Sequence, residues 1–257
     1  MDIRIDGIKV HYETKGAGKN VLLLHGWGAS IQSFMPVVDA LSEEKRVAVL
    51  DFPGFGESGK PPRHFGVSEY MELTAEFIRQ TGIQKTDVIC HSFGGRVTIM
   101  LAATYPELVD KIVFIDSAGL IRKRKPSYYL KVYHYKLMKK AARSKFGKRL
   151  YGILGIDVQN RLQNAGSADY KALDDDMKAI FVRVVNKDLK GYLKDIRSPS
   201  LLIWGENDTE TPVRFGEIME KEIPDAGLVV LKNAGHYAYL DRFPQFMKII
   251  RHFLGGK

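Results

Sequence analysis

The chain has 257 residues, of which 45% are hydrophobic and 27% charged, a composition ordinary for a soluble globular protein of one domain, with or without an insertion. No apolar run approaches the roughly 20 residues that span a bilayer, and the N-terminus has no apolar signal core, so we expect a cytoplasmic protein. A single cysteine excludes an internal disulfide and any zinc site built on several thiolates.

The net charge of +9 is unevenly distributed. Residues 121–150 contain twelve lysines and arginines and no acidic residue, and the rest of the chain has 27 basic against 30 acidic residues, or −3. The favoured interpretation is a solvated helical face with Tyr128, Tyr133 and Leu137 turned inward. The alternatives are a docking surface for an acidic carrier or other anionic partner, and attachment to a membrane surface. Nucleic-acid binding is not expected, because no nucleic-acid-reading motif accompanies the charge.

Hydrophobic periodicity predicts strands that alternate with helices. Residues 2–6 and 8–13 alternate as in a hairpin. Short apolar runs typical of buried parallel strands occupy 21–26, 47–52, 87–92, 111–116, 200–205 and 227–232. Helical patterns occupy 31–42, 68–82, 94–104, 213–222 and 243–254. This order predicts an α/β fold with a doubly wound, mostly parallel sheet.

One interval interrupts the alternation. Residues 119–196 contain no good strand, and a helical pattern at 176–185 places Met177, Ile180, Phe181 and Val184 on one face. We therefore expect a sheet-containing core formed by residues 1–118 and 196–257. Residues 119–195 are expected to form an inserted, all-helical lid or cap.

The stretch "CHSFGG" at 90–95 lies at the end of a predicted strand and before a predicted helix. A serine with small residues two positions to either side is typical of a nucleophile elbow, a turn so sharp that bulky neighbours would collide. Cys90 stands where glycine is usual. Ser92 is therefore the candidate nucleophile. Cys90 lies inside the strand, where a buried thiol is usually unreactive.

A serine hydroxyl needs a base to accept its proton, and the base needs an acid to orient it. His236 follows the last predicted strand, and Asp208 follows the strand before it. The chain order Ser92, Asp208, His236 is the order expected with a nucleophile elbow. Asp116, at the end of an earlier strand, is the rival acid, although we favour a capping role for it.

Two backbone N–H groups should complete the site as an oxyanion hole. One is expected from Phe93, the residue after the nucleophile. The other is expected from Trp27, in the glycine-containing loop after the strand at 21–26. His25 is interpreted as holding this loop and His91 as packing at the elbow. The segment 51–56 lacks the spacing of a phosphate loop and is read as a turn.

The sequence resembles the α/β-hydrolase fold superfamily, in its Ser–Asp–His type with a helical lid, over nearly the whole chain. The resemblance rests on "LLLHGWG", "DFPGFGESGKP", "CHSFGG", "LLIWGENDTETP" and "NAGHYAYLDR", which follow the family's order and spacing. It implies a water-using acyl hydrolase without a cofactor, and a lid inserted after the sixth strand. No spacing of histidines and carboxylates indicates a metal site.

We therefore expect a serine hydrolase acting on small to medium, mostly apolar carboxylic esters through an acyl-enzyme. The lid should supply an apolar substrate pocket, with Tyr128, Tyr129, Tyr133 and Met138 as its candidate residues. The alternatives are a carbon–carbon bond hydrolase or a lyase on the same triad. A further alternative is a hydrolase-fold receptor that binds its ligand with little turnover.

Overall fold

A computed structural model of the chain describes residues 1–62, 64–83, 85–121, 130, 133, 137, 140, 144 and 173–255. Eight strands form one sheet, and each lies within about two residues of the range predicted from the hydrophobic pattern. The strands are β1 (Asp2–Ile5), β2 (Ile8–Lys15), β3 (Asn20–Leu24), β4 (Arg46–Leu50), β5 (Thr86–His91), β6 (Val109–Ile115), β7 (Ser200–Gly205) and β8 (Ala226–Leu231).

The strand order is β1-β2-β4-β3-β5-β6-β7-β8. The strand β2 pairs antiparallel with both β1 and β4, and all pairs from β4 to β8 are parallel. The carboxyl ends of β3, β5, β6, β7 and β8 therefore meet at one edge, where open α/β sheets bind their ligands. This arrangement confirms the predicted doubly wound, mostly parallel sheet.

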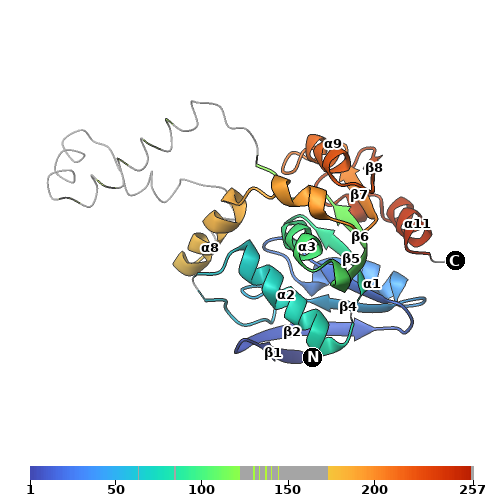
Figure 1. The fold of residues 1–257 in the computed structure, drawn as a ribbon, viewed down its shortest axis with the longest axis horizontal. Coiled ribbons are helices and arrows are strands. Elements are labelled where there is room, and N and C mark those ends of the chain that lie inside the picture. Colours follow the sequence, from blue (N-terminus) through green and yellow to red (C-terminus); the bar gives the residue numbers. More distant parts are fainter. Residues whose placement is uncertain are drawn as a thin grey trace. The chain divides into compact units, whose positions relative to one another are not determined.

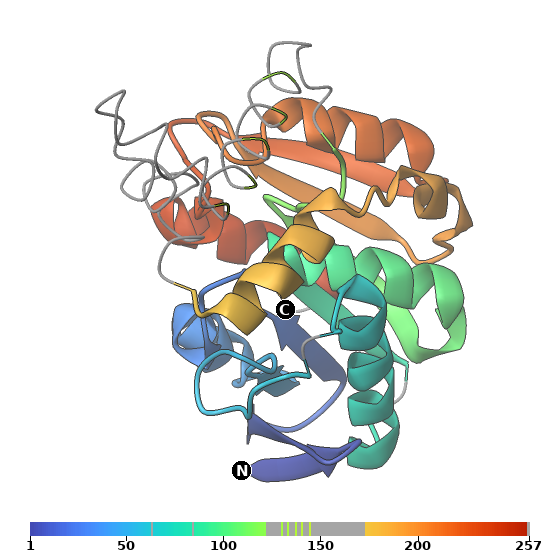
Figure 2. The same ribbon diagram turned by 90° about the vertical axis from the view of Figure 1, so that its left-hand side faces the viewer.

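Helices cover both faces of the sheet (Figures 1 and 2). Helices α1 and α11 pack on one face, and α2, α3 and α9 pack on the other. Their bounds are α1 (Met35–Leu41), α2 (Val67–Thr81), α3 (Phe93–Thr104), α9 (Val213–Glu222) and α11 (Phe243–Leu254).

The core explains why the central strands are apolar throughout. In β3, Leu23 belongs to the cluster beneath α1 and α11, while Leu22 and Leu24 point to the opposite face. All three side chains are buried completely, which contributes about 2 kcal/mol each to folding. Because both faces are covered, the strands carry continuous apolar runs without polar alternation.

Short helical turns are the elements that periodicity misses. The predicted helix at 31–42 is divided into a 3-10 turn, Ile31–Phe34, and α1, because Pro36 lacks an N–H and fits the first turn of a helix. The four-residue α10 (Ala238–Asp241) and the 3-10 turn Lys190–Asp195 are too short to give a helical pattern. The pattern at 176–185 is confirmed as α8 (Asp175–Asn186).

The chain divides into two compact units. The first contains residues 1–120 and 179–257 and includes the sheet, and the second contains residues 121–178. Ile180, Leu189 and Leu193 are buried in the first unit, although the sequence places them in the cap. Most of the second unit lies outside the described residues, including almost all of the basic segment 121–150.

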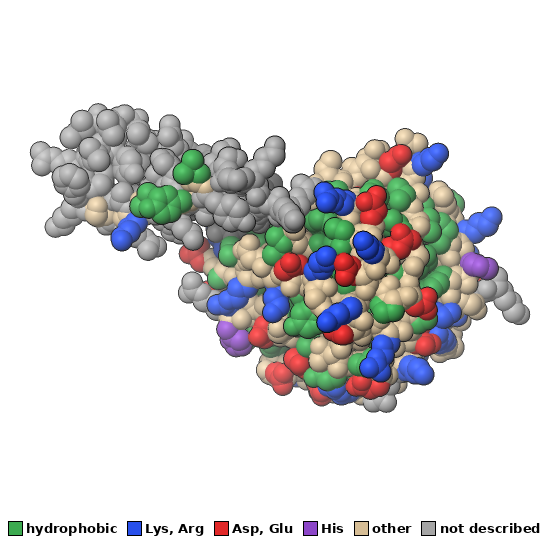
Figure 3. Space-filling view, turned by 45° about the horizontal axis from the view of Figure 1, so that its top comes forward, with side chains coloured by type: hydrophobic (Ala, Val, Ile, Leu, Met, Phe, Trp, Pro, Cys, Tyr) green, Lys and Arg blue, Asp and Glu red, His purple; other side chains and the backbone are tan. Residues whose placement is uncertain are grey.

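Lysine and arginine side chains alternate with aspartate and glutamate over the face of the described residues that Figure 3 shows. This mixed surface agrees with the small net charge that remains when residues 121–150 are left out. No helix of the described part is long and apolar enough to cross a membrane.

Candidate active site

Ser92 occupies a sharp turn between β5 and α3. Its backbone has φ 47° and ψ −107°, a strained conformation for a residue with a side chain. The turn brings the backbone against β3: a Cβ at Gly94 would lie 2.1 Å from the carbonyl oxygen of Leu24. Cys90 is fully buried, and burial raises the pKa of its thiol to about 12. The Cys90 side chain therefore contributes to core packing and has no reactive thiolate near neutral pH.

Substituting alanine for Gly94 tests the elbow. The added methyl group would meet backbone, which cannot rotate away, so we expect Gly94→Ala to lower the free energy of unfolding by about 3 kcal/mol. Gly227→Ala is the matched control, because its Cβ has nothing within 4 Å and the change should stay within about 0.5 kcal/mol. Urea denaturation measures both. Equal stability of the two variants would contradict this description of the elbow.

Three predicted side chains meet at the carboxyl edge of the sheet. His236, in the loop after β8, places Nε2 3.0 Å from Oγ of Ser92 and Nδ1 2.8 Å from Oδ2 of Asp208. Asp208 lies in the loop after β7, where its Oδ1 accepts the backbone N–H groups of Glu210 and Thr211. Residues separated by up to 144 positions therefore form a single hydrogen-bonded chain.

The ionisation of this chain favours proton transfer from serine to histidine. Burial would raise the pKa of Asp208, but the hydrogen bonds from His236 and Thr211 outweigh it and hold that pKa below its usual value. Burial would lower the pKa of His236, but the bond to Asp208 and the charges of Asp208 and Glu210 raise it overall. Since an ionised carboxylate only accepts, the neutral imidazole donates from Nδ1, and Nε2 is left to accept from Ser92.

Asp116 anchors the loops that carry the acid and the histidine. Its fully buried carboxylate accepts the N–H of Gly205, at the end of β7, and the N–H of Ala238, two residues after His236. Burial raises the pKa of Asp116 to about 8. The bonds go to backbone amides at the end of β7 and at the first residue of α10, as expected for a capping residue, and the acid that bonds to His236 is Asp208.

Two further histidines hold the backbone. His91 donates from Nε2 to the carbonyl of His236 at 2.7 Å, and burial lowers its pKa to about 3, so that it stays neutral. His25 donates from Nδ1 to the carbonyl of Gly26, and its Nε2 accepts the N–H of Phe52. The second contact agrees with the predicted loop-holding role. His91 does more than the packing that the sequence indicates.

The segment 51–56 is a structural turn, as predicted. The buried carboxylate of Asp51 accepts the N–H groups of Ile31 and Glu57, and Gly56 adopts φ 51° directly against that carboxylate. A phosphate could not approach this backbone, because an anionic side chain already occupies it.

The two predicted oxyanion-hole amides belong to segments next to Ser92. Phe93 is the first residue of α3, so its N–H has no partner within the helix. Trp27 lies in the loop after β3, next to Gly26, where an added Cβ would be 3.4 Å from Cβ of Ser92. Among the described residues neither N–H donates a backbone hydrogen bond, as the predicted oxyanion hole requires.

An aromatic wall surrounds Trp27. Its ring lies 4.9 Å from Phe55, 5.2 Å from Phe93 and 5.2 Å from Phe181, in each case edge to face. The indole N–H is buried and finds no acceptor among the described residues. Such a wall suits an apolar group beside the predicted nucleophile.

Of the predicted substrate-binding residues, only Tyr133 is described. Tyr133 is 62% exposed and Leu137 is 47% exposed. The substrate-binding role expected of Tyr133 stays a prediction. Tyr128, Tyr129 and Met138 lie outside the described residues.

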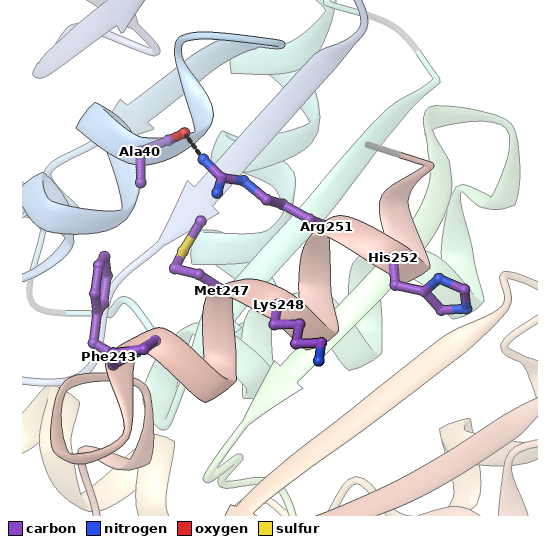
Figure 4. A pocket seen from close by; sticks show the side chains of 7 residues that line it. Ala40, Phe243, Met247, Lys248, Arg251 and His252 are labelled. Carbon is purple, nitrogen blue, oxygen red and sulfur yellow. Dashed lines mark hydrogen bonds between the residues drawn. The ribbon is translucent and has the colours of Figure 1, made fainter. Parts of the chain in front are cut away.

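A separate groove of about 650 Å³ runs along α11 and includes Ala40 of α1 (Figure 4). Phe243 and Met247 line it, and the guanidinium of Arg251 crosses to donate to the carbonyl of Ala40 at 2.8 Å. None of the residues predicted to act in the site lines this groove. Over the described ranges, no group of three histidine, cysteine or acidic side chains is placed to hold a metal ion.

Sequence reasoning missed two residues that lie beside Asp208 and His236. The hydroxyl of Thr211 lies 2.7 Å from Oδ2 of Asp208 and 2.8 Å from the carbonyl oxygen of Asp116, and it can donate to either. The carboxylate of Glu210 lies 3.4 Å from Nε2 of His236. Their closeness in sequence to Asp208 was the only signal, and it does not specify where their side chains point.

Comparison with known proteins agrees with this architecture. The sequence profile described as the alpha/beta hydrolase fold matches residues 19–243. The chain therefore belongs to the α/β-hydrolase fold family.

Individual relatives have different activities in their names. The chain is 24% identical to the pimeloyl-[acyl-carrier protein] methyl ester esterase of Aliivibrio salmonicida, over 95% of each chain. It is 27% identical to the 2-hydroxy-6-oxononadienedioate/2-hydroxy-6-oxononatrienedioate hydrolase of Paraburkholderia phymatum, over 96% of this chain and 91% of that protein. The crystal structure of the enol-lactonase from Burkholderia xenovorans LB400 superposes with a TM-score of 0.76 at 19% identity, covering 99% of this chain and all (100%) of that one. The names of these similar proteins therefore include an esterase, a hydrolase of oxo-dienedioates and a lactonase.

Proposed function

We propose that this protein is a serine hydrolase that cleaves small to medium carboxylic esters through an acyl-enzyme. The observation that carries the proposal is the hydrogen-bonded chain from Oγ of Ser92 through His236 to Asp208, at 3.0 and 2.8 Å. These are the distances that a general base and its orienting acid require. The segment between β6 and β7 is proposed to act as the lid.

The proposed reaction follows from this geometry. His236 accepts the proton of Ser92 through Nε2 while Oγ attacks the ester carbonyl, and Asp208 stabilises the imidazolium. The N–H groups of Trp27 and Phe93 stabilise the negative oxygen of the tetrahedral intermediate. The imidazolium then gives its proton to the leaving alcohol oxygen. Water repeats the sequence on the acyl-enzyme and releases the acid.

The pH dependence of kcat/KM tests the role of His236. A protonated imidazole cannot accept the serine proton, so activity should be low in acid and rise with pH through the pKa of His236. That pKa is raised from 6.5, so the midpoint should lie above this value. Asp208, whose pKa is lowered from 3.8, stays ionised throughout. A profile from about pH 5 to 9 for a neutral aryl ester measures the midpoint. A rate independent of pH over this range would contradict the proposed base.

Carbon–carbon bond cleavage is the second candidate, favoured by the similarity to the hydrolase of Paraburkholderia phymatum. An ester on an acidic carrier protein is a third substrate class, in line with the basic segment 121–150 and the named substrate of the Aliivibrio esterase. Turnover of aryl esters of increasing chain length, beside a diketone and a lactone, separates the first two. A rate that depends on salt only for carrier-bound substrate would favour the third.

A receptor with little turnover is separated from an enzyme by two measurements on one sample. A fluorophosphonate should label Ser92 in either case, because it reports only the activated hydroxyl. An enzyme should then turn over many ester molecules per site. Labelling without multiple turnover on any ester of the panel would favour the receptor.

A further inference from the structure

Glu210 is a third acidic residue near His236, after Asp208 and Asp116. Its Oε2 lies 3.4 Å from Nε2 of His236, the nitrogen that lies 3.0 Å from Oγ of Ser92. Asp208 bonds to the other ring nitrogen, so Glu210 faces the reacting side of the imidazole. Its side chain is 65% exposed, whereas that of Asp208 is fully buried. The carboxylate of Glu210 is therefore both open to solvent and close to the nitrogen that is proposed to move the proton.

The position of Glu210 is fixed by the triad acid itself. Oδ1 of Asp208 accepts the N–H of Glu210 at 2.8 Å and the N–H of Thr211 at 3.0 Å. The buried hydroxyl of Thr211 bonds in turn to Asp208 and to the backbone of Asp116. The backbone at 210 thus cannot move away from His236 without breaking the acid's own hydrogen bonds, and only the carboxylate end is free to turn.

In the part of the chain that the structure describes, no lysine or arginine pairs with Glu210, and its one partner at ion-pair distance is His236, which is neutral when Nε2 accepts from Ser92. A carboxylate at the rim of a site attracts positive and repels negative groups that come within a few ångströms. The group that comes closest is the one bonded to the leaving oxygen, because that oxygen must receive its proton from Nε2 of His236.

We propose that Glu210 is a specificity-determining residue that selects the charge of the leaving alcohol, accepting neutral and cationic alcohols and disfavouring anionic ones. This inference rests on the proposed esterase function and adds to it a class of substrate. It concerns the alcohol part of the ester. The aromatic wall around Trp27 makes no such demand on the acyl part.

Three acetate esters of para-substituted phenols test the selection. Their substituents are a sulfonate, a sulfonamide and a trimethylammonium group, which are anionic, neutral and cationic at similar size. The kcat/KM ratio of sulfonamide to sulfonate ester should fall about five- to tenfold in Glu210→Gln, and the preference for the cationic ester should shrink likewise. Glu210→Asp keeps the charge and should retain much of both preferences. In the original protein, high salt should compress both ratios, because Glu210 is exposed.

The matched control is Glu217→Gln, which removes the same charge from the exposed surface of α9. It should leave the substrate ratios unchanged. When the sulfonate is placed on the acyl group in place of the phenol, the kcat/KM ratio of neutral to anionic ester should differ less between the original protein and Glu210→Gln. If the original protein and Glu210→Gln gave equal ratios for the phenol series, the inference would be overturned. So would an equal effect of Glu217→Gln, or an equal effect of a charge on the acyl end.

A second readout separates an electrostatic from a merely structural role. Among the described residues, the groups facing His236 include the acidic side chains of Asp208, Glu210 and Asp116, the neutral ring of His91, the phenol ring of Tyr237 and the hydroxyl of Thr211. The negative charge of Glu210 is one of the charges that raise the pKa of His236. The acid limb of the pH profile of kcat/KM should therefore move to lower pH in Glu210→Gln. It should stay in place in Glu217→Gln. An unmoved limb together with unchanged ratios would show that Glu210 plays no electrostatic part.

Failure of this inference is distinguishable from failure of the proposed function. If the neutral ester is hydrolysed and Ser92→Ala abolishes that hydrolysis, the esterase proposal stands and the ratios alone decide the role of Glu210. If no ester of the three is hydrolysed by a protein that is folded by circular dichroism, both proposals fall.

Discussion

Ser92→Ala is expected to reduce ester turnover by about 10⁴-fold or more. The hydroxyl lost is the one that lies 3.0 Å from Nε2 of His236, and the other side chain near that nitrogen among the described residues, the carboxylate of Glu210 at 3.4 Å, has no proton to give when ionised. The free energy of unfolding should change little, because alanine keeps the Cβ of serine and the backbone holds the strained turn. Initial rates with an aryl ester and urea denaturation of the same preparation measure the two effects.

Cys90→Ala is the control for this experiment. The thiol is fully buried and its pKa is raised to about 12 by burial, so it cannot act as a nucleophile near neutral pH. Activity should therefore stay within a few-fold of the original, with a stability loss of about 1 kcal/mol for the missing packing. Normal activity in Ser92→Ala, or its loss in Cys90→Ala with stability intact, would mean that the nucleophile has been misassigned.

Asp208→Asn is expected to lower kcat by about 10³- to 10⁴-fold. The amide that replaces the carboxylate can donate to Nδ1 of His236, which reverses the tautomer and turns Nε2 into a donor. Nε2 then cannot accept the proton of Ser92. The variant also loses the negative charge that stabilises the imidazolium, and the drop in kcat should persist at saturating ester.

Asp116→Asn is the informative comparison, because this acid is equally buried but bonds to the backbone N–H groups of Gly205 and Ala238. An asparagine oxygen can keep one of the two bonds, so we expect a smaller loss of activity, about tenfold, with some loss of stability. If Asp116→Asn were the more damaging for kcat while Asp208→Asn were mild, the acid of the triad would be Asp116.

The fold could be predicted because the central strands are apolar runs bounded by turns, the first two strands alternate, and each long helix has a clear period. The meeting of Ser92, Asp208 and His236 could be predicted because each follows a strand of a parallel sheet, and the carboxyl ends of such strands lie at one edge.

The supporting contacts could not be predicted, because they depend on distances across the sheet. Asp116 reaches Gly205 and Ala238 over 89 and 122 positions, and nothing in the local sequence pairs these residues. The direction of an exposed side chain such as Glu210 is likewise not encoded in a periodic pattern.

The most direct test of the central claim is to trap the acyl-enzyme and locate it. Aryl acetate is mixed with the protein, the reaction is quenched in acid during the first turnover, and the peptides are analysed by mass spectrometry. One acetyl group per molecule is expected on Ser92, released with the phenol burst and absent from His236→Ala. An acetyl group found on Cys90 or elsewhere, or steady turnover with no acylated peptide, would contradict the account.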